Sequence, residues 1–137
     1  MRFPTLVRKS TERPLIAVAI EAANGGRTQS DMLVDMGSDL TLIPEHVATL
    51  LRIDLSLVPY SPVSSPLGPA ANYRACNVVL ELRRPPDVFR WRTTVGFVAR
   101  PMTYGIFGTR GFFQFFNVRY HASEHWLEVE PAGPLPQ

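Results

Sequence analysis

One acidic residue of this chain stands in surroundings where a carboxylate is costly. Asp35 directly follows the apolar residues 32–34 and precedes Met36 and Gly37. An acid at the end of a hydrophobic strand must turn to solvent, find hydrogen-bond donors or change its pKa, because an unpaired buried charge is expensive. The loop alone leaves two interpretations open: a reactive carboxylate, or an Asx-turn aspartate before Gly37.

The reactive interpretation requires a second carboxylate. Two aspartates about 3 Å apart share one proton, so that one acts as base towards a water and the other as acid towards a substrate carbonyl. The chain has a single Asp-x-Gly loop between apolar segments, and neither Asp31 nor Asp39 repeats the pattern. A two-fold homodimer would supply the missing partner, because it brings Asp35 from each subunit to the axis.

The segments around Asp35 predict the elements that position it. A β-rich run at 14–22 ends in the turn signal Asn24-Gly25-Gly26. A second strand at 28–34 delivers Asp35 to a loop, and the apolar extended pattern resumes at 40–43. Pro44 then opens a short helix over 44–51, with Val47, Leu50 and Leu51 expected on one face.

The rest of the chain also predicts strands. Four prolines between residues 59 and 69 exclude a regular central strand there, and composition alone favours a plain loop over a projecting hairpin. Four phenylalanines within residues 112–116 must be mostly buried. Further strands are expected at 73–82, at 89–98 with Trp91, Val95 and Phe97 in the core, at 104–108, and in a closing hairpin of 117–120 and 126–130.

Length and composition place these elements in one folded domain. The chain has 137 residues, of which 45% are hydrophobic and 19% charged, and its 13 prolines and 9 glycines argue against long helices. We expect an all-β fold, a compact closed antiparallel barrel with one or two short helices. Residues 1–13 are expected to be a lead-in, 14–130 the domain and 131–137 a flexible tail.

Composition also excludes several functions. A net charge of +2 without a large basic cluster is too little for nucleic-acid binding. The three histidines lack ligand partners, so we expect no metal and no cofactor. The longest strongly apolar stretch, residues 15–20, is too short to span a membrane. A single cysteine, Cys76, and the lack of a secretory signal indicate a reducing compartment, the cytoplasm.

Three motifs in order resemble the retropepsin-like aspartic proteases, particularly the small single-domain bacterial ones, over residues 14–130. The first is similar to the family's hydrophobic-hydrophobic-Asp-Thr-Gly-Ser/Ala-Asp motif, and the second to its hydrophobic-hydrophobic-Gly motif. The third looks like the closing segment of the bacterial domains. In this chain the motifs are Leu33-Val34-Asp35-Met36-Gly37-Ser38-Asp39, Ile106-Phe107-Gly108 and Gly111-Phe112-Phe113-Gln114-Phe115-Phe116-Asn117-Val118.

The resemblance implies a role for each site residue. Asp35 would be the catalytic aspartate in a loop with Met36, Gly37 and Ser38, and Ser38 would orient its carboxylate. Gly37 would let the substrate backbone approach, because it has no Cβ. Asp39 would hold substrate main chain or pair with an Arg near the second motif. Residues 59–73 would form the flap over the substrate, with Ser65 and Gly68 as substrate contacts.

Two residues depart from the family pattern, and they leave two possible functions open. Met36 stands where the family usually has Thr or Ser, and a thioether cannot donate the hydrogen bond that the hydroxyl makes across the dimer axis. Arg110 comes one position later than the family's Arg after Gly108. The first function is an aspartic endopeptidase that cleaves extended peptides as a homodimer. The alternative is a catalytically impaired domain that serves as a dimerisation or peptide-binding module.

Overall fold

The computed structural model describes residues 1–8, 11–63 and 71–137, and strands are the main element among them. The strands are β1 Arg2–Pro4, β2 Leu6–Arg8, β3 Thr11–Arg13, β4 Leu15–Glu21, β5 Arg27–Val34, β6 Leu42–Pro44, β7 Ser61–Val63, β8 Ala71–Arg84, β9 Asp87–Val98, β10 Gly105–Phe107, β11 Phe116–His121 and β12 Trp126–Pro131. One short α-helix, α1 Glu45–Leu50, follows β6, and the 3₁₀ turn η1 Ala122–Glu124 joins β11 to β12. The strands, the short helix and the turn that were expected from residue 14 onward are confirmed.

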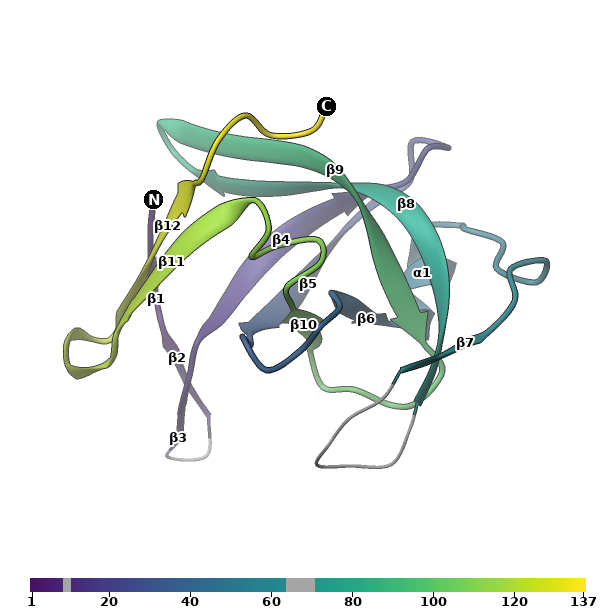
Figure 1. Ribbon diagram of the computed structural model, residues 1–137, viewed down its shortest axis with the longest axis horizontal. Coiled ribbons are helices and arrows are strands. Elements are labelled where there is room, and N and C mark those ends of the chain that lie inside the picture. Colours follow the sequence, from purple (N-terminus) through teal and green to yellow (C-terminus); the bar gives the residue numbers. More distant parts are fainter. Residues whose placement is uncertain (9–10, 64–70) are drawn as a thin grey trace.

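The main sheet closes into a barrel. Its strand order is β4-β5-β10-β6-β9-β8-β7, and a further pairing of β4 with β8 closes a ring (Figure 1). The long β8–β9 hairpin forms one wall, and β7 is an edge strand, which suits its central proline. The predicted all-β closed barrel is therefore confirmed. Two of its ladders, β5 with β10 and β6 with β9, are parallel, which the sequence analysis did not anticipate.

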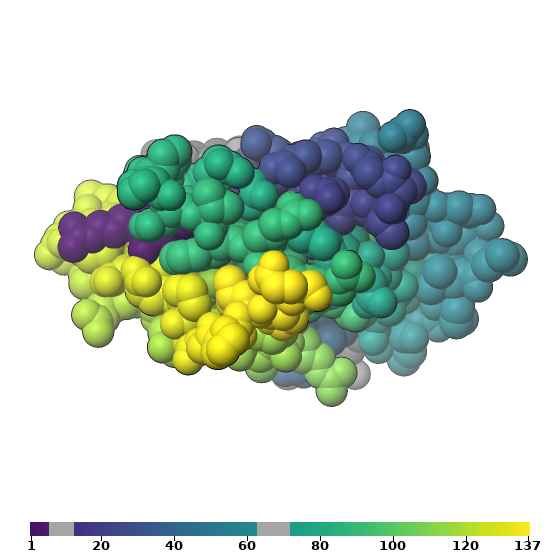
Figure 2. Space-filling model, turned by 90° about the horizontal axis from the view of Figure 1, so that it is seen from above, coloured from purple at the N-terminus to yellow at the C-terminus, as the bar shows by residue number. Residues whose placement is uncertain are grey.

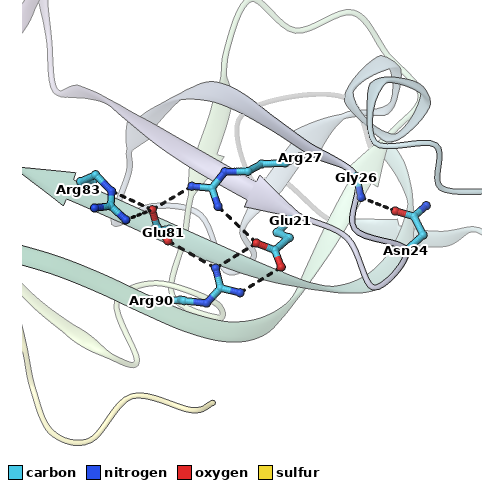
Figure 3. A network of polar contacts seen from close by, with 7 residues as sticks. All are labelled: Glu21, Asn24, Gly26, Arg27, Glu81, Arg83 and Arg90. Carbon is cyan, nitrogen blue, oxygen red and sulfur yellow. Dashed lines mark hydrogen bonds and ion pairs between the residues drawn. The ribbon is translucent and has the colours of Figure 1, made fainter.

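A network of arginines and glutamates crosses the seam where β4 meets β8 (Figure 3). Glu81 accepts hydrogen bonds from Arg27 at 2.9 Å and from Arg83 at 3.1 Å. Glu21 accepts from both Arg90 guanidinium nitrogens at 3.1 Å, and Arg90 also reaches Glu81 at 3.5 Å. The network joins β4, β5, β8 and β9, so it ties together the strands that close the barrel.

Aromatic side chains fill the barrel. Trp91, Val95 and Phe97, the core residues predicted on β9, are all at most 2% exposed. Phe112 and Phe116 are equally buried, and the two phenylalanines between them pack against the same core. The prediction that this aromatic block is mostly buried is confirmed.

The buried face of helix α1 differs from the predicted one. Val47, Ala48 and Leu51 are buried, whereas Leu50 is 61% exposed. With about 100° per residue, Val47, Leu51 and Ala48 span an arc of about 100°, and Leu50 lies about 60° outside that arc, on the solvent side. The prediction that Leu50 shares the buried face was therefore wrong.

The two ends of the described chain meet in a second sheet. Its order is β1-β12-β11, and Phe3 of β1 lies in the core. Strands β1, β2 and β3, which lie in the expected lead-in, were not predicted. Nor was β7, which lies in the segment where composition favoured a plain loop. After β12 the chain runs along β9, where the Arg92 N–H donates to Pro136 O at 2.8 Å and the Gln137 side chain donates to Arg90 O. Figure 2 shows these C-terminal residues in yellow across one face.

Candidate active site

The loop that carries Asp35 is held by the second motif. Strands β5 and β10 run parallel, with Ile106 opposite Leu33 and Phe107 opposite Val34. The main-chain N–H of Asp35 then donates to Phe107 O at 3.1 Å, which extends the ladder by one bond beyond β5. The two motifs, about 70 residues apart in the sequence, are therefore joined directly beneath Asp35.

The Asp35 carboxylate belongs to a tight turn at the tip of this loop. It is half-buried, and its Oδ1 accepts a hydrogen bond from the Gly37 N–H at 2.9 Å. The Ser38 N–H donates to Asp35 O at 3.2 Å and closes the turn. This is the Asx-turn geometry that the sequence left open, and it also fixes the direction of the carboxylate.

Met36 and Gly37 leave the tip of the loop open. The Met36 side chain is 81% exposed, which is unusual for a large apolar residue. A Cβ placed on Gly37 would lie 3.2 Å from Asp35 Oδ1 and meet nothing else within 4 Å among the residues described. The surface around the carboxylate is therefore accessible to another molecule.

The far side of the loop is anchored by main-chain bonds. The Thr109 N–H donates to Ser38 O and the Arg110 N–H to Asp39 O, both at 2.9 Å. The Ser38 hydroxyl donates to Leu40 O at 2.7 Å, not to the Asp35 carboxylate as the resemblance implied. The exposed carboxylate of Asp39 makes no ion pair with Arg110, or with any other cation in the described parts of the chain. Asp39 and Arg110 are joined through their backbones instead.

Gly108 lies where this loop crosses the end of β10. A Cβ on Gly108 would overlap the carbonyl oxygen of Leu40. Its N–H donates to the Thr41 hydroxyl at 3.2 Å, and that hydroxyl donates to Arg110 O at 2.8 Å. Thr41 is only 1% exposed, so its hydroxyl is a structural link between the two motifs.

This role of Thr41 was not predicted from the sequence. The available signal was the position of one hydroxyl residue within the apolar run 40–43. A buried hydroxyl requires a hydrogen-bond partner, but the partner, Arg110 O, is distant in the sequence.

The aromatic core supports the second motif from inside the barrel. The Phe107 ring stacks on Phe112 with centroids 4.1 Å apart, and Trp91 contacts both rings. The Trp91 indole N–H donates to Gly111 O at 2.9 Å. These contacts fix β10, and through it the position of Asp35.

The region expected to be the flap is described only at its two ends. There, Ser61–Val63 (β7) pairs antiparallel with the start of β8, as the arms of a hairpin do. Ser65 and Gly68 lie outside the described residues. At the base of the arms, the Arg74 guanidinium lies 4.0 Å from the Tyr60 ring centroid and 3.4 Å from a Glu45 carboxylate oxygen. These contacts attach the hairpin base to α1.

The site offers carboxylates but no cluster of metal ligands. Across residues 1–8, 11–63 and 71–137, no three His, Cys, Asp or Glu side chains gather in a way that could hold a metal ion. In the same residues, no helix is long and apolar enough to cross a membrane. The loop supplies one positioned carboxylate, Asp35, and hydrolysis by a proton-sharing pair would require a second.

Solved structures resemble this architecture. A retropepsin-like aspartic protease from Rickettsia conorii matches with a TM-score of 0.62 over 94% of this chain and 89% of its own, at 11% sequence identity. EIAV protease in complex with the inhibitor HBY-793 matches with a TM-score of 0.40 over 76% of this chain and 88% of its own, at 16% identity. No family model and no curated protein matches the sequence. At 11% identity, the similarity to the Rickettsia structure is one of fold.

Proposed function

We propose that this chain, which has the retropepsin-like fold, is an aspartic endopeptidase that acts as a homodimer. The main support is the position of Asp35. Its main chain is bonded to Phe107 O, its carboxylate is oriented by the Gly37 N–H, and its neighbour Met36 is exposed. A carboxylate that is held in this way at an open loop tip is accessible to the same group of a second copy.

The reaction would use one carboxylate from each subunit. The ionised member of the pair takes a proton from water, and the protonated member, the partner's Asp35, donates to the carbonyl oxygen of the scissile bond. The open space beside Gly37 lets an extended peptide approach, and the exposed Asp39 carboxylate can accept from its main chain. We expect the segment 59–73 to act as the flap that covers the substrate and excludes water. We propose that the enzyme uses no cofactor and acts in the cytoplasm.

Substitution of Asp35 by Asn tests the proposed role. Because an amide cannot exchange the proton, we expect hydrolysis of an unfolded protein or peptide library between pH 4 and 7 to fall at least about 100-fold. Asp54→Asn is the matched control, because the Asp54 carboxylate accepts the Ser56 N–H in the same kind of turn, also at 2.9 Å. Equal hydrolysis by wild type and Asp35→Asn would exclude Asp35 as the catalytic group.

Met36 favours one alternative function, a catalytically impaired dimerisation or peptide-binding module. A thioether cannot form the hydrogen bond across the axis that Thr or Ser would form. Calorimetric titration with a pepstatin-type transition-state mimic distinguishes the two functions. Tight binding that Asp35→Asn abolishes supports the peptidase, whereas failure to bind favours the module.

A further inference from the structure

A second candidate site lies away from Asp35, beside the edge of β9. A groove of about 510 Å³ opens there between β9 and the segment that follows β10. Polar residues from both segments and from the end of the Asp35 loop line it: Thr41, Arg92, Thr93, Thr94, Arg110 and Gln114. Asp35 does not contribute to this lining.

The groove contains a short open stretch of β-strand edge. Strand β6 pairs with β9 only over 96–98, and β8 covers the opposite edge. On the β6 side, the Gly96 N–H is bonded to Thr41 O and the Arg92 N–H to Pro136 O. Because alternate residues of a strand direct their main-chain groups to the same side, Thr94 directs its N–H and C=O into the groove between these two points. On this β6 side of β9, no strand among the described residues lies opposite Thr94, whereas Asn77 of β8 is its partner on the other side.

Two guanidinium groups border this open edge. Neither Arg92 nor Arg110 forms an ion pair or a side-chain hydrogen bond within the described part of the chain. By contrast, Arg27 and Arg90 both pair with glutamates at the barrel seam. The main chains of Arg92 and Arg110 are nevertheless fixed by hydrogen bonds to Pro136 O and Asp39 O. The groove thus combines two exposed arginines, whose main chains are held in place, with the main-chain N–H and C=O of Thr94.

We propose that this groove binds the C-terminal residue of a peptide. Arg92 and Arg110 bind the terminal carboxylate, because a guanidinium matches a carboxylate in charge and in hydrogen-bonding geometry. The N–H and C=O of Thr94 bind the main chain of the last residue. A longer strand does not fit, because the bonds of Arg92 and Gly96 occupy the edge on both sides of Thr94. The edge therefore pairs with one residue only, and the two arginines favour a terminal residue, which carries a carboxylate, over an internal one.

Binding can be measured on the full-length protein without any hydrolysis. Acetyl-trialanine with a free carboxyl group is titrated into labelled protein, and the Thr94 amide is followed by NMR. We expect the Thr94 signal to shift and to saturate. The C-terminal amide of the same peptide should bind at least about tenfold more weakly, because one charge-assisted hydrogen bond contributes roughly that factor.

Variants test the two arginines. Arg92→Gln and Arg110→Gln should each weaken binding of the free-acid peptide about tenfold. Arg119→Gln, on β11 and outside the groove lining, removes the same charge and should leave binding unchanged. Two separate variants keep the test valid if one of them fails to fold.

Three results would overturn the inference. The first is an absence of any Thr94 shift at saturating free-acid peptide. The second is equal binding of acetyl-Ala-Asp-Ala-amide, which would indicate a general carboxylate site. The third is an equal response to inorganic phosphate, which would indicate a simple anion site. None of these results depends on peptidase activity, so failure here and failure of the proposed function are distinguishable.

Discussion

Met36 and Asp35 are neighbours with opposite properties. The Asp35 carboxylate is oriented by the Gly37 main-chain N–H, whereas the Met36 side chain is 81% exposed and has no hydrogen-bond donor. In the proposed dimer the two loops face each other across the axis, so Met36 would fill space there without forming a polar link. At this scale a single side chain influences dimer strength, while the adjacent backbone positions the acid.

We expect Met36→Thr to strengthen the dimer. A threonine hydroxyl can donate across the axis, and one net hydrogen bond of about 1 kcal/mol corresponds to roughly a fivefold to tenfold lower dissociation constant. Sedimentation measures the change directly. Met36→Leu is the control, because it keeps an apolar side chain and adds no donor. An unchanged or weaker Met36→Thr dimer would contradict the proposed arrangement.

Gly108→Ala should destabilise the fold. A Cβ at this position would overlap Leu40 O and lie 2.7 Å from Ser38 O, and both are backbone atoms that cannot move aside easily. Overpacking of this kind costs about 1–3 kcal/mol or more of unfolding free energy, which urea titration measures. In Gly133→Ala the new Cβ meets nothing within 4 Å, so stability should change little. Equal stability of the two variants would show that the loop adapts.

At the scale of elements, ionic contacts reinforce the seam of the barrel. Burial of the Glu81 carboxyl by itself raises its pKa, but hydrogen bonds from Arg27 and Arg83 outweigh burial and hold the pKa below the ordinary value of 4.5. The hydrogen bond from Arg90 is the main cause that lowers the pKa of Glu21. Both carboxylates are therefore more acidic in the folded state than in the unfolded state.

The sign of these shifts predicts an acid-sensitive seam. A group with a depressed folded pKa contributes stability above its unfolded pKa and loses that contribution as the pH falls through the folded pKa. The melting temperature should therefore fall below about pH 4.5. Glu81→Gln should be less stable than wild type at pH 7 and less sensitive to acid. Glu124→Gln, in the turn before β12, should retain the wild-type pH profile. Parallel profiles for wild type and Glu81→Gln would contradict this account.

At the scale of the whole molecule, the proposed activity depends on concentration. One chain has one loop of the Asp35 type, so the monomer would be inactive and only the dimer would hydrolyse peptides. We expect specific activity to fall on dilution, with a midpoint equal to the dimer dissociation constant from sedimentation. Constant specific activity in solutions that contain only monomer would exclude the shared site.

Local patterns in the sequence determined most of the barrel and identified the candidate residue. The turn at Asn24-Gly25-Gly26 is one example, since Gly25 adopts a φ of +87° and Asn24 caps the Gly26 N–H. The alternation of apolar and polar residues, and turns at Gly and Pro, depend only on neighbouring residues. Strands such as β4, β5 and β9 could therefore be predicted. Asp35 was identified in the same way, as an acid that interrupts an apolar pattern.

Tertiary structure alone decided which distant groups meet. The parallel pairing of β5 with β10, the Thr41 bridge to Arg110 and the Arg27–Glu81 contact at the seam all join residues far apart in the chain. No local pattern encodes such pairings, because the closed barrel selects partners through hydrogen bonds and packing that exist only after it forms. The three-residue strands β1, β2 and β3 were missed for a related reason. Their extended form depends on pairing with other segments, because a strand that short has too little pattern of its own.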